Sequence, residues 1–395
     1  MEIRSFRFDR LEFAGSLGDL GTLIPLSLGL IVITGLSAST VFLMVGLFYV
    51  VSGLYYRLPI PVQPLKVVAA IAIAAPNGIT VPVMAAAGII FGLVLLVLAA
   101  TGAVDLIARL FTKPIIRGIQ LGLGFILARK GLDMILSRDL FLQNAGPDIL
   151  SGPVALNTVI GIAGFVIALL LLSSRRFPAA LVVVALGILA GLAAGALGGM
   201  TFNAGPTAMG LVKPTTQDFL SALVLLVIPQ IPLTIGNAVM GTADTCCALF
   251  GTGAATRRTT YRAFASSMGL VNIVGGMFGA MPMCHGAGGL AAHYRFGART
   301  GGSNLMIGAL FIVVALLFGK ISVSLLAAIP QAVLGVLLLY AGLELALLVR
   351  DVSEKNDLFV AFLIAGVGLA TTNMALAFAI GMVVSWLIRR SGLEI

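Results

Sequence analysis

The chain has 395 residues, of which 59% are apolar and only 10% are charged, and its mean hydropathy is +1.12. This composition excludes an ordinary soluble domain, because so apolar a chain needs the lipid bilayer as its solvent. The sequence fits spanning helices of about 20 apolar residues, and it lacks the alternating segments of about 10 residues typical of a membrane barrel. The formal charge of +9 is spread between the apolar runs, so nucleic acid is not an expected partner.

Apolar segments follow one another along the chain, separated by Gly, Pro, Asn and charged clusters. The first ten residues are polar and basic, so we expect the first segment to remain in the mature protein and not to be a cleaved signal. The pattern predicts an all-helical polytopic membrane protein with about fourteen spans. The candidate spans are 15–33, 39–56, 62–76, 82–101, 114–135, 156–173, 179–199, 219–241, 262–279, 284–295, 303–319, 322–348, 358–372 and 374–390.

The basic residues test this arrangement, because each added or missed span would exchange the sides of every later loop. With the N-terminus in the cytoplasm, eighteen of the 24 Lys and Arg residues fall inside. We therefore expect a multi-pass membrane protein with both termini in the cytoplasm. Lys66 lies within an apolar segment and belongs to neither side. The basic residues placed outside are Arg129, Lys130, Arg138, Lys213 and Lys320.

Two segments have the pattern of a short helix preceded by an extended stretch. In residues 58–72, closely spaced prolines prevent a helix until Gln63, so Lys66 lies in the first helical turn. In residues 279–295, a Pro-containing stretch leads through Cys284 and His285 into the next helix. By the span count the two helices enter from opposite sides. Their N-termini would meet at mid-membrane, where free backbone N–H groups form an anion site.

A weaker internal similarity supports a repeated architecture. Residues 16–19 (SLGD) resemble residues 234–237 (TIGN), and each precedes one of the two broken helices by a nearly equal length of chain. The sequence therefore predicts two inverted halves, 1–200 and 201–395.

These motifs resemble those of the molybdate transporters of the sulfate permease superfamily that lack a STAS domain. The resemblance rests on PVQPLK at 61–66, on GAMPMCHGAGGLAAHYRFG at 279–297 and on FAGSLGDLGT at 13–22. It implies the seven-plus-seven inverted-repeat fold shared with uracil permeases, in which a core domain moves against a gate domain. Substrate would then lie between the first, third, eighth and tenth spans. The implied core is 12–105 and 217–320, and the implied gate is 106–200 and 321–395, with no STAS domain.

Several polar residues within the spans are candidates for contact with an oxyanion. Lys66 could attract the anion or neutralise Asp19, or it could belong to a purely structural ion pair. Gln63 could contact substrate or cap its helix, and His285 could donate to the anion, carry a proton or cap a helix. The substrate-binding candidates are Gln63, Lys66, Cys284, His285, Gly286, Asp19, Thr22, Gln230, Thr234 and Asn237. The candidates for carrying a coupling proton are Asp19, Asp244 and His285.

The sequence thus predicts a secondary active transporter of a tetrahedral oxyanion, either molybdate or sulfate. Proton symport is the expected coupling, because a dianion must enter against a negative interior. No nucleotide motif or zinc-ligand spacing is present, so we expect neither an enzyme, a metal site nor a cofactor. The alternative is an anion channel or a voltage-responsive motor protein on the same fold. Gate-to-gate homodimers are common in similar folds, and the oligomeric state stays open.

Overall fold

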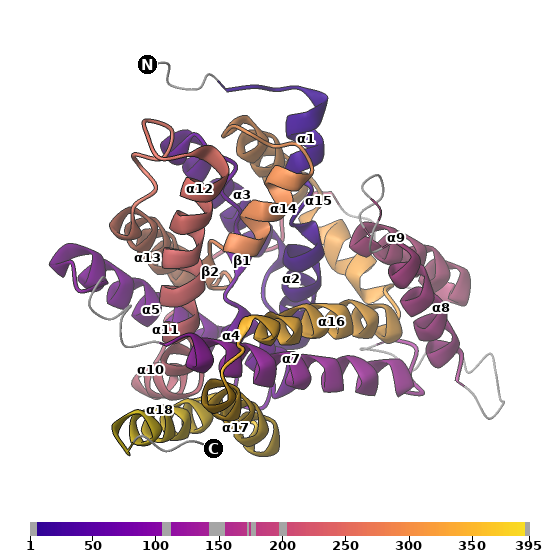
Figure 1. Cartoon of the computed structure of the whole chain (residues 1–395). Helices are drawn as coiled ribbons and strands as arrows, with labels where there is room; N and C mark the ends of the chain where they lie inside the picture. The colour runs from indigo at the N-terminus through magenta and orange to yellow at the C-terminus, as the bar shows by residue number, and fades with distance from the viewer. Residues whose placement is uncertain are drawn as a thin grey trace.

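The computed structural model (Figure 1) describes residues 6–104, 112–141, 155–171, 174, 179–196 and 204–391. These ranges are mostly helical, as the apolar segments predict. The elements of the first half are α1 (Arg10–Ser16), α2 (Leu20–Thr34), α3 (Ala38–Tyr56), β1 (Gln63–Pro64), α4 (Lys66–Ala74), α5 (Val81–Thr101), α7 (Lys113–Leu136), α8 (Leu156–Leu171), α9 (Ala179–Gly191) and the π-helical turn η1 (Leu192–Ala196).

The second half begins with a long rod in which α-helical and π-helical turns alternate. The rod consists of α10 (Thr216–Ala222), η2 (Leu223–Val227), α11 (Ile228–Leu233), η3 (Thr234–Gly241) and α12 (Thr242–Phe250). The elements that follow are α13 (Tyr261–Met277), β2 (Met283–Cys284), α14 (Ala287–Arg295), α15 (Gly302–Ala327), α16 (Gln331–Ala346), the 3₁₀ turn η4 (Leu347–Asp351), α17 (Lys355–Thr371) and α18 (Met374–Ser391).

Helix lengths separate full spans from half spans. Within the described ranges, seven helices are long and apolar enough to cross a membrane, and the pair α1 and α2, bent by 43°, would make an eighth. In contrast, α4 and α14 have nine residues each, against the roughly 20 that a span requires. Each follows a short extended strand, which confirms the two broken helices. The count of fourteen spans stays a prediction.

Two of the expected span boundaries are wrong. We expected a break between 319 and 322, but α15 continues to Ala327 and α16 begins after Pro330. Glycine is tolerated within membrane helices, whereas proline lacks an N–H and favours a helix start. The eighth segment was expected to end at 241, but its helical rod runs on to Phe250, because Gly241 lies in a π-helical turn and not at a helix end.

Close helix contacts join the two halves of the chain. Helix α3 packs against α15 and α5 against α13, while α7 packs against both α16 and α17. Small residues allow these approaches. A Cβ atom on Gly92 would lie 2.6 Å from the carbonyl oxygen of Gly269, and one on Gly124 would lie 2.5 Å from that of Gly342. The division into a core and a gate stays a prediction.

Figure 1 shows what surrounds the two broken helices. Strands β1 and β2 lie side by side at the centre, between α13 and α2. Helix α7, which packs closely against α16, passes beneath α4, and α16 also contacts α2. The broken helices therefore begin in the interior of the bundle.

Candidate functional site

The two extended segments pair with each other. Strands β1 and β2 run antiparallel, with Gln63 opposite Cys284 and Pro64 opposite Met283. The N–H of Leu65 also donates to the carbonyl of Pro282, at 2.9 Å. Antiparallel pairing agrees with two segments that enter from opposite sides, and it brings the starts of α4 and α14 close together.

Side chains satisfy the carbonyl groups of the proline-rich segment before β1. Ring nitrogen Nδ1 of His293 lies 3.0 Å from the carbonyl of Pro59, and Nδ1 of His285 lies 2.8 Å from that of Pro61. Asn304 donates to the Ile60 carbonyl at 2.7 Å, and Tyr49 donates to the Val62 carbonyl at 3.3 Å. Four consecutive carbonyls are thus paired without a helix or sheet, which meets the requirement for buried backbone in a membrane. The residues in this paired segment are Pro59, Ile60, Pro61 and Val62.

The side chain of Asn272 on α13 forms hydrogen bonds with the backbone of β2. Its Oδ1 accepts from the N–H of Met283 at 2.8 Å, and its Nδ2 donates to the carbonyl of Met283 at 2.7 Å.

We expect Asn272→Ala to lower the thermal stability of the detergent-purified protein, because each buried group left unpaired costs about 1–3 kcal/mol. Asn304→Ala, which frees one carbonyl, should lower the melting temperature less. Equal melting temperatures for the two variants would contradict this explanation.

Asp19 and Gln63 form a polar contact beside the start of α14. Nε2 of Gln63 donates to both oxygens of the Asp19 carboxylate, at 2.9 and 2.8 Å, and both side chains are buried. A Cβ atom on Gly289 would lie 2.6 Å from Asp19 Oδ2 and 2.6 Å from Gln63 Nε2. A Cβ atom on Gly286 would collide with Gln63 Oε1. These two glycines therefore let the backbone of α14 approach the pair.

One polar atom of this pair has no partner. Oε1 of Gln63 is buried and accepts no hydrogen bond from the residues that the structure describes. The first helical bond of α14 comes from Leu290, and within the described residues the N–H groups of Ala287, Gly288 and Gly289 donate to no side chain. The start of α14 thus offers free N–H donors, which is the anion-binding arrangement expected of a helix N-terminus, while the Gln63 oxygen beside them is an acceptor that would repel an anion.

The start of α4 differs, because Gln230 occupies its donors. Oε1 of Gln230 accepts from the N–H groups of Val67 and Val68, at 2.9 and 3.3 Å, while Nε2 donates to the Thr234 hydroxyl at 2.9 Å. Gln230 lies between two prolines at 229 and 232, and the π-helical turns η2 and η3 flank this stretch. We expected free N–H groups at both broken helices, but Gln230 occupies two of those at α4, whereas among the described residues no side chain accepts from Ala287, Gly288 or Gly289 of α14.

Lys66, Cys284 and Thr22 lie around the Asp19 carboxylate. Lys66 is the first residue of α4 and is half-buried. Its ammonium interacts electrostatically with Asp19 and Cys284, but it forms no ion pair with any described residue. The Thr22 hydroxyl, in the first turn of α2, also interacts with Asp19. The structure thus gathers these predicted residues around one buried carboxylate.

His285 lies apart from the free donors of α14. Because the Pro61 carbonyl can only accept, Nδ1 of His285 carries a proton, and Nε2 lies 3.2 Å from the Ser267 hydroxyl. The ring packs against Phe48 and Phe264. Both nitrogens therefore have protein partners, which favours a structural role over direct substrate contact.

Asp244 and Asn237 also lie outside this cluster of contacts. Asp244 is exposed in α12 and accepts a hydrogen bond from the Tyr261 hydroxyl at 3.0 Å. Asn237 is half-buried in the π-helical turn η3, and its backbone carbonyl accepts from Thr242 at 3.3 Å. Neither forms a hydrogen bond with Asp19 or Gln63 among the described residues.

Several residues that hold the site together were missed by the sequence reasoning. They share one signal, a polar group within or beside an apolar segment, but their partners are distant in the chain. Glu12 belongs with them: it is buried, and its carboxylate accepts from the N–H groups of Arg299 and Thr300, at 3.0 and 3.3 Å. The missed residues are Glu12, Tyr49, Asn272, His293 and Asn304.

Helices of membrane-spanning length surround two half-helices whose preceding strands pair, with charged and amide groups near the starts of these half-helices; such features define a class of protein. They are the features of a multi-pass membrane transporter.

Comparison with known proteins agrees with this class. Residues 11–127 and 222–345 match the family described as "Molybdate transporter of MFS superfamily". The chain is 33% identical to molybdate transporter 2 of Arabidopsis thaliana, over 97% of this chain and 88% of that protein. It is 31% identical to molybdate transporter 1 of Chlamydomonas reinhardtii, over 94% and 90%. The chain therefore belongs to the molybdate transporter family.

Solved structures show the same fold at low sequence identity. The transmembrane domain of the cyanobacterial bicarbonate transporter BicA superposes with a TM-score of 0.68 at 16% identity, covering 96% of this chain and 98% of that one. The murine anion transporter Slc26a9, in an inward-facing state, superposes with a TM-score of 0.69 at 16% identity, covering 100% and 70%. The chain is an integral membrane anion transporter with this fold, and it is not an enzyme.

Proposed function

We propose that this chain is a secondary active transporter that carries molybdate, with sulfate as the competing oxyanion, and that a proton bound at Asp19 accompanies the anion. The curated relatives are named molybdate transporters, and their similarity extends over nearly the whole chain. They support the choice of molybdate. The observation that carries the proposal is the Asp19–Gln63 pair beside the free N–H groups of α14.

The orientation of the Gln63 amide connects the two ligands. When Asp19 is ionised, the amide turns Nε2 toward the carboxylate and leaves Oε1, an acceptor, near Gly286. An oxyanion beside that acceptor would meet two sources of repulsion, the Gln63 oxygen and the Asp19 charge. The anion site is therefore unfavourable while Asp19 is ionised.

Protonation of Asp19 reverses both effects. The carboxylic O–H becomes a donor, so the Gln63 amide rotates to accept it at Oε1 and turns Nε2 toward the start of α14. The site loses one negative charge and gains an N–H donor. Binding of the proton therefore favours binding of the oxyanion, because protonation removes the repulsion between the anion and the site. By linkage, the bound oxyanion favours protonation of Asp19 to the same extent.

Other groups near Asp19 influence its ionisation and the binding of the anion. Lys66 on α4 faces the carboxylate at longer range, and Cys284 on β2 and Tyr49 on α3 are its other titratable neighbours. The Lys66 ammonium supplies the charge that attracts the dianion from either side. With the core moving against the gate, the loaded site would face the cytoplasm and the outside in turn.

Uptake into proteoliposomes tests this function. Labelled molybdate and sulfate are offered with and without an inward proton gradient to the unmodified protein, to Lys66→Ala and to Lys213→Ala, which removes an exposed lysine. We expect gradient-stimulated molybdate uptake to fall at least about tenfold in Lys66→Ala, because one charged hydrogen bond contributes about 1.5–3 kcal/mol. Lys213→Ala should not differ from the unmodified protein. Anion conductance without uphill uptake would instead support the channel alternative.

A further inference from the structure

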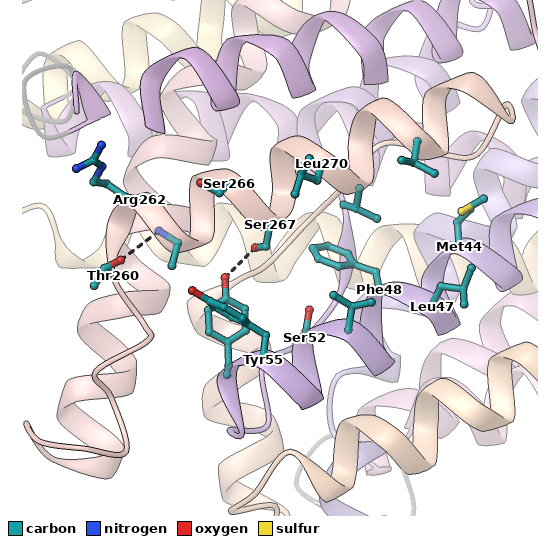
Figure 2. Close-up of a pocket in the computed structure, with 15 residues that line it drawn as sticks. Met44, Leu47, Phe48, Ser52, Tyr55, Thr260, Arg262, Ser266, Ser267 and Leu270 are labelled. Atoms are coloured by element: carbon teal, nitrogen blue, oxygen red, sulfur yellow. Dashed lines mark hydrogen bonds between the residues drawn. The ribbon is translucent and has the colours of Figure 1, made fainter. Parts of the chain in front are cut away.

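A groove of about 640 Å³ runs between α3 and α13 (Figure 2). Its rim is formed by apolar side chains that remain exposed, including Leu47 at 41%, Val51 at 56% and Leu270 at 59%. Both helices are expected to cross the bilayer, so the groove faces acyl chains and not water. An exposed apolar groove at this depth is suited to a lipid tail.

One end of the groove is basic. Arg262 and Thr260 line it at the start of α13, opposite Tyr55 near the end of α3 (Figure 2). The exposed Arg262 guanidinium is held there by bonds to the carbonyls of Ala99 and Ala100 on α5, at 2.9 and 3.1 Å.

A second arginine lies at the same end. Arg258 donates to the Tyr55 carbonyl at 2.9 Å, and its guanidinium lies 5.7 Å from the centre of the Tyr55 ring. Two guanidinium groups at the end of an apolar groove complement an anionic head group. By the positive-inside rule, this end faces the cytoplasm.

Hydroxyl groups line the groove next to its basic end. Ser52 lines the groove from α3, and its buried Oγ has no hydrogen-bond partner within the described ranges. Ser266 and Ser267 line the groove from the facing helix. These serines place polar groups between the basic end of the groove and its apolar part.

We propose that the groove binds one anionic phospholipid. The phosphate lies at Arg258 and Arg262, the glycerol ester region lies beside Ser52, and an acyl chain runs past Leu47 toward Met44. The order of charge, hydroxyl and apolar surface along the groove matches the order of these groups in a phospholipid.

Ser267, which lines this groove, contacts residues that position the extended segment of the transport site. Ser267 lies 2.8 Å from the Tyr56 hydroxyl, the bond drawn in Figure 2, and 3.2 Å from Nε2 of His285. His285 in turn holds the Pro61 carbonyl. A lipid seated in the groove therefore packs against the wall that fixes the extended segment before β1, and it should raise the melting temperature of the protein.

Native mass spectrometry of the delipidated protein in detergent tests the assignment. Phosphatidylglycerol and phosphatidylcholine with identical acyl chains are the probes, and oleate is the competitor. We expect one tightly retained phosphatidylglycerol, with phosphatidylcholine held several-fold less well. Arg262→Gln should lower phosphatidylglycerol retention about fivefold, the effect of one basic residue near an anionic lipid, and Ser266→Phe should remove it by filling the groove.

Two control variants keep the result specific. Arg257→Gln removes an exposed arginine that does not line the groove, and Leu93→Phe adds bulk to the exposed side of α5, so both should retain phosphatidylglycerol. Each variant is compared by gel filtration and helical circular dichroism to establish folding. Equal retention of the two phospholipids, displacement by oleate at equal concentration, or unchanged retention in folded Ser266→Phe would overturn the proposal.

Discussion

Replacing Gly289 with alanine is expected to lower molybdate uptake by about 10- to 100-fold, while the same change at Gly288 should leave uptake nearly unchanged. A Cβ atom at Gly289 would lie 2.6 Å from Asp19 Oδ2 and from Gln63 Nε2, whereas one at Gly288 would meet nothing within 4 Å. The first variant must separate Asp19 from Gln63 or move the start of α14. Loss of a charged hydrogen bond of about 1.5–3 kcal/mol gives the expected magnitude.

The comparison is sharp because both glycines lie in the first turn of the same helix. The added methyl group changes helix propensity equally in the two variants, so any difference between them reports the contact with Asp19 and Gln63. Initial uptake rates and melting temperatures would be measured for both. Similar uptake by the two folded variants would remove Asp19 and Gln63 from the site.

Replacing Asp19 with asparagine is expected to separate anion exchange from proton-driven accumulation. The amide is neutral at every pH, as the protonated carboxyl group is, so it should permit anion binding without a proton. We expect molybdate exchange between the two sides to persist within about tenfold, because the anion-binding donors of α14 remain. Uphill uptake driven by an inward proton gradient should be abolished.

The same prediction includes a direction for the change of uptake with pH. In the unmodified protein the proton is a co-substrate, so uptake should fall as the external pH rises, whereas exchange by Asp19→Asn should not change with pH. Asp244→Asn is the matched control, because Asp244 is exposed and bonded to Tyr261. Gradient-stimulated uptake by Asp19→Asn, or its loss in Asp244→Asn, would assign the coupling proton elsewhere.

Local sequence patterns predicted the broken helices, but they did not predict whether a side chain caps the N–H groups at each helix start. Three prolines within six residues, at 59, 61 and 64, disfavour a helix, so the extended approach to α4 follows from short-range sterics. The capping of α4 by Gln230 joins residues far apart in the chain, and it depends on the π-helical turns on either side of α11. No local pattern reports such a contact.

His285 illustrates the same limit for a single residue. Its place at the start of a broken helix suggested contact with the anion, but the direction of its side chain depends on the packing of α3 and α13. In the structure its ring lies among aromatic side chains, with Pro61 and Ser267 on its two nitrogens. Position along the chain predicted the neighbourhood, while side-chain direction required the packed helices.

The sequence by itself determined that this protein is a helical membrane protein with two half-helices and polar residues near their starts. Apolar composition, proline spacing and glycine content act through solvation and backbone sterics, which need no partner. Only the tertiary structure decided that Gln63 bonds Asp19, that α4 is capped while α14 is free, and that a groove separates α3 from α13. These features depend on helix rotation and register, which are set when distant segments pack together.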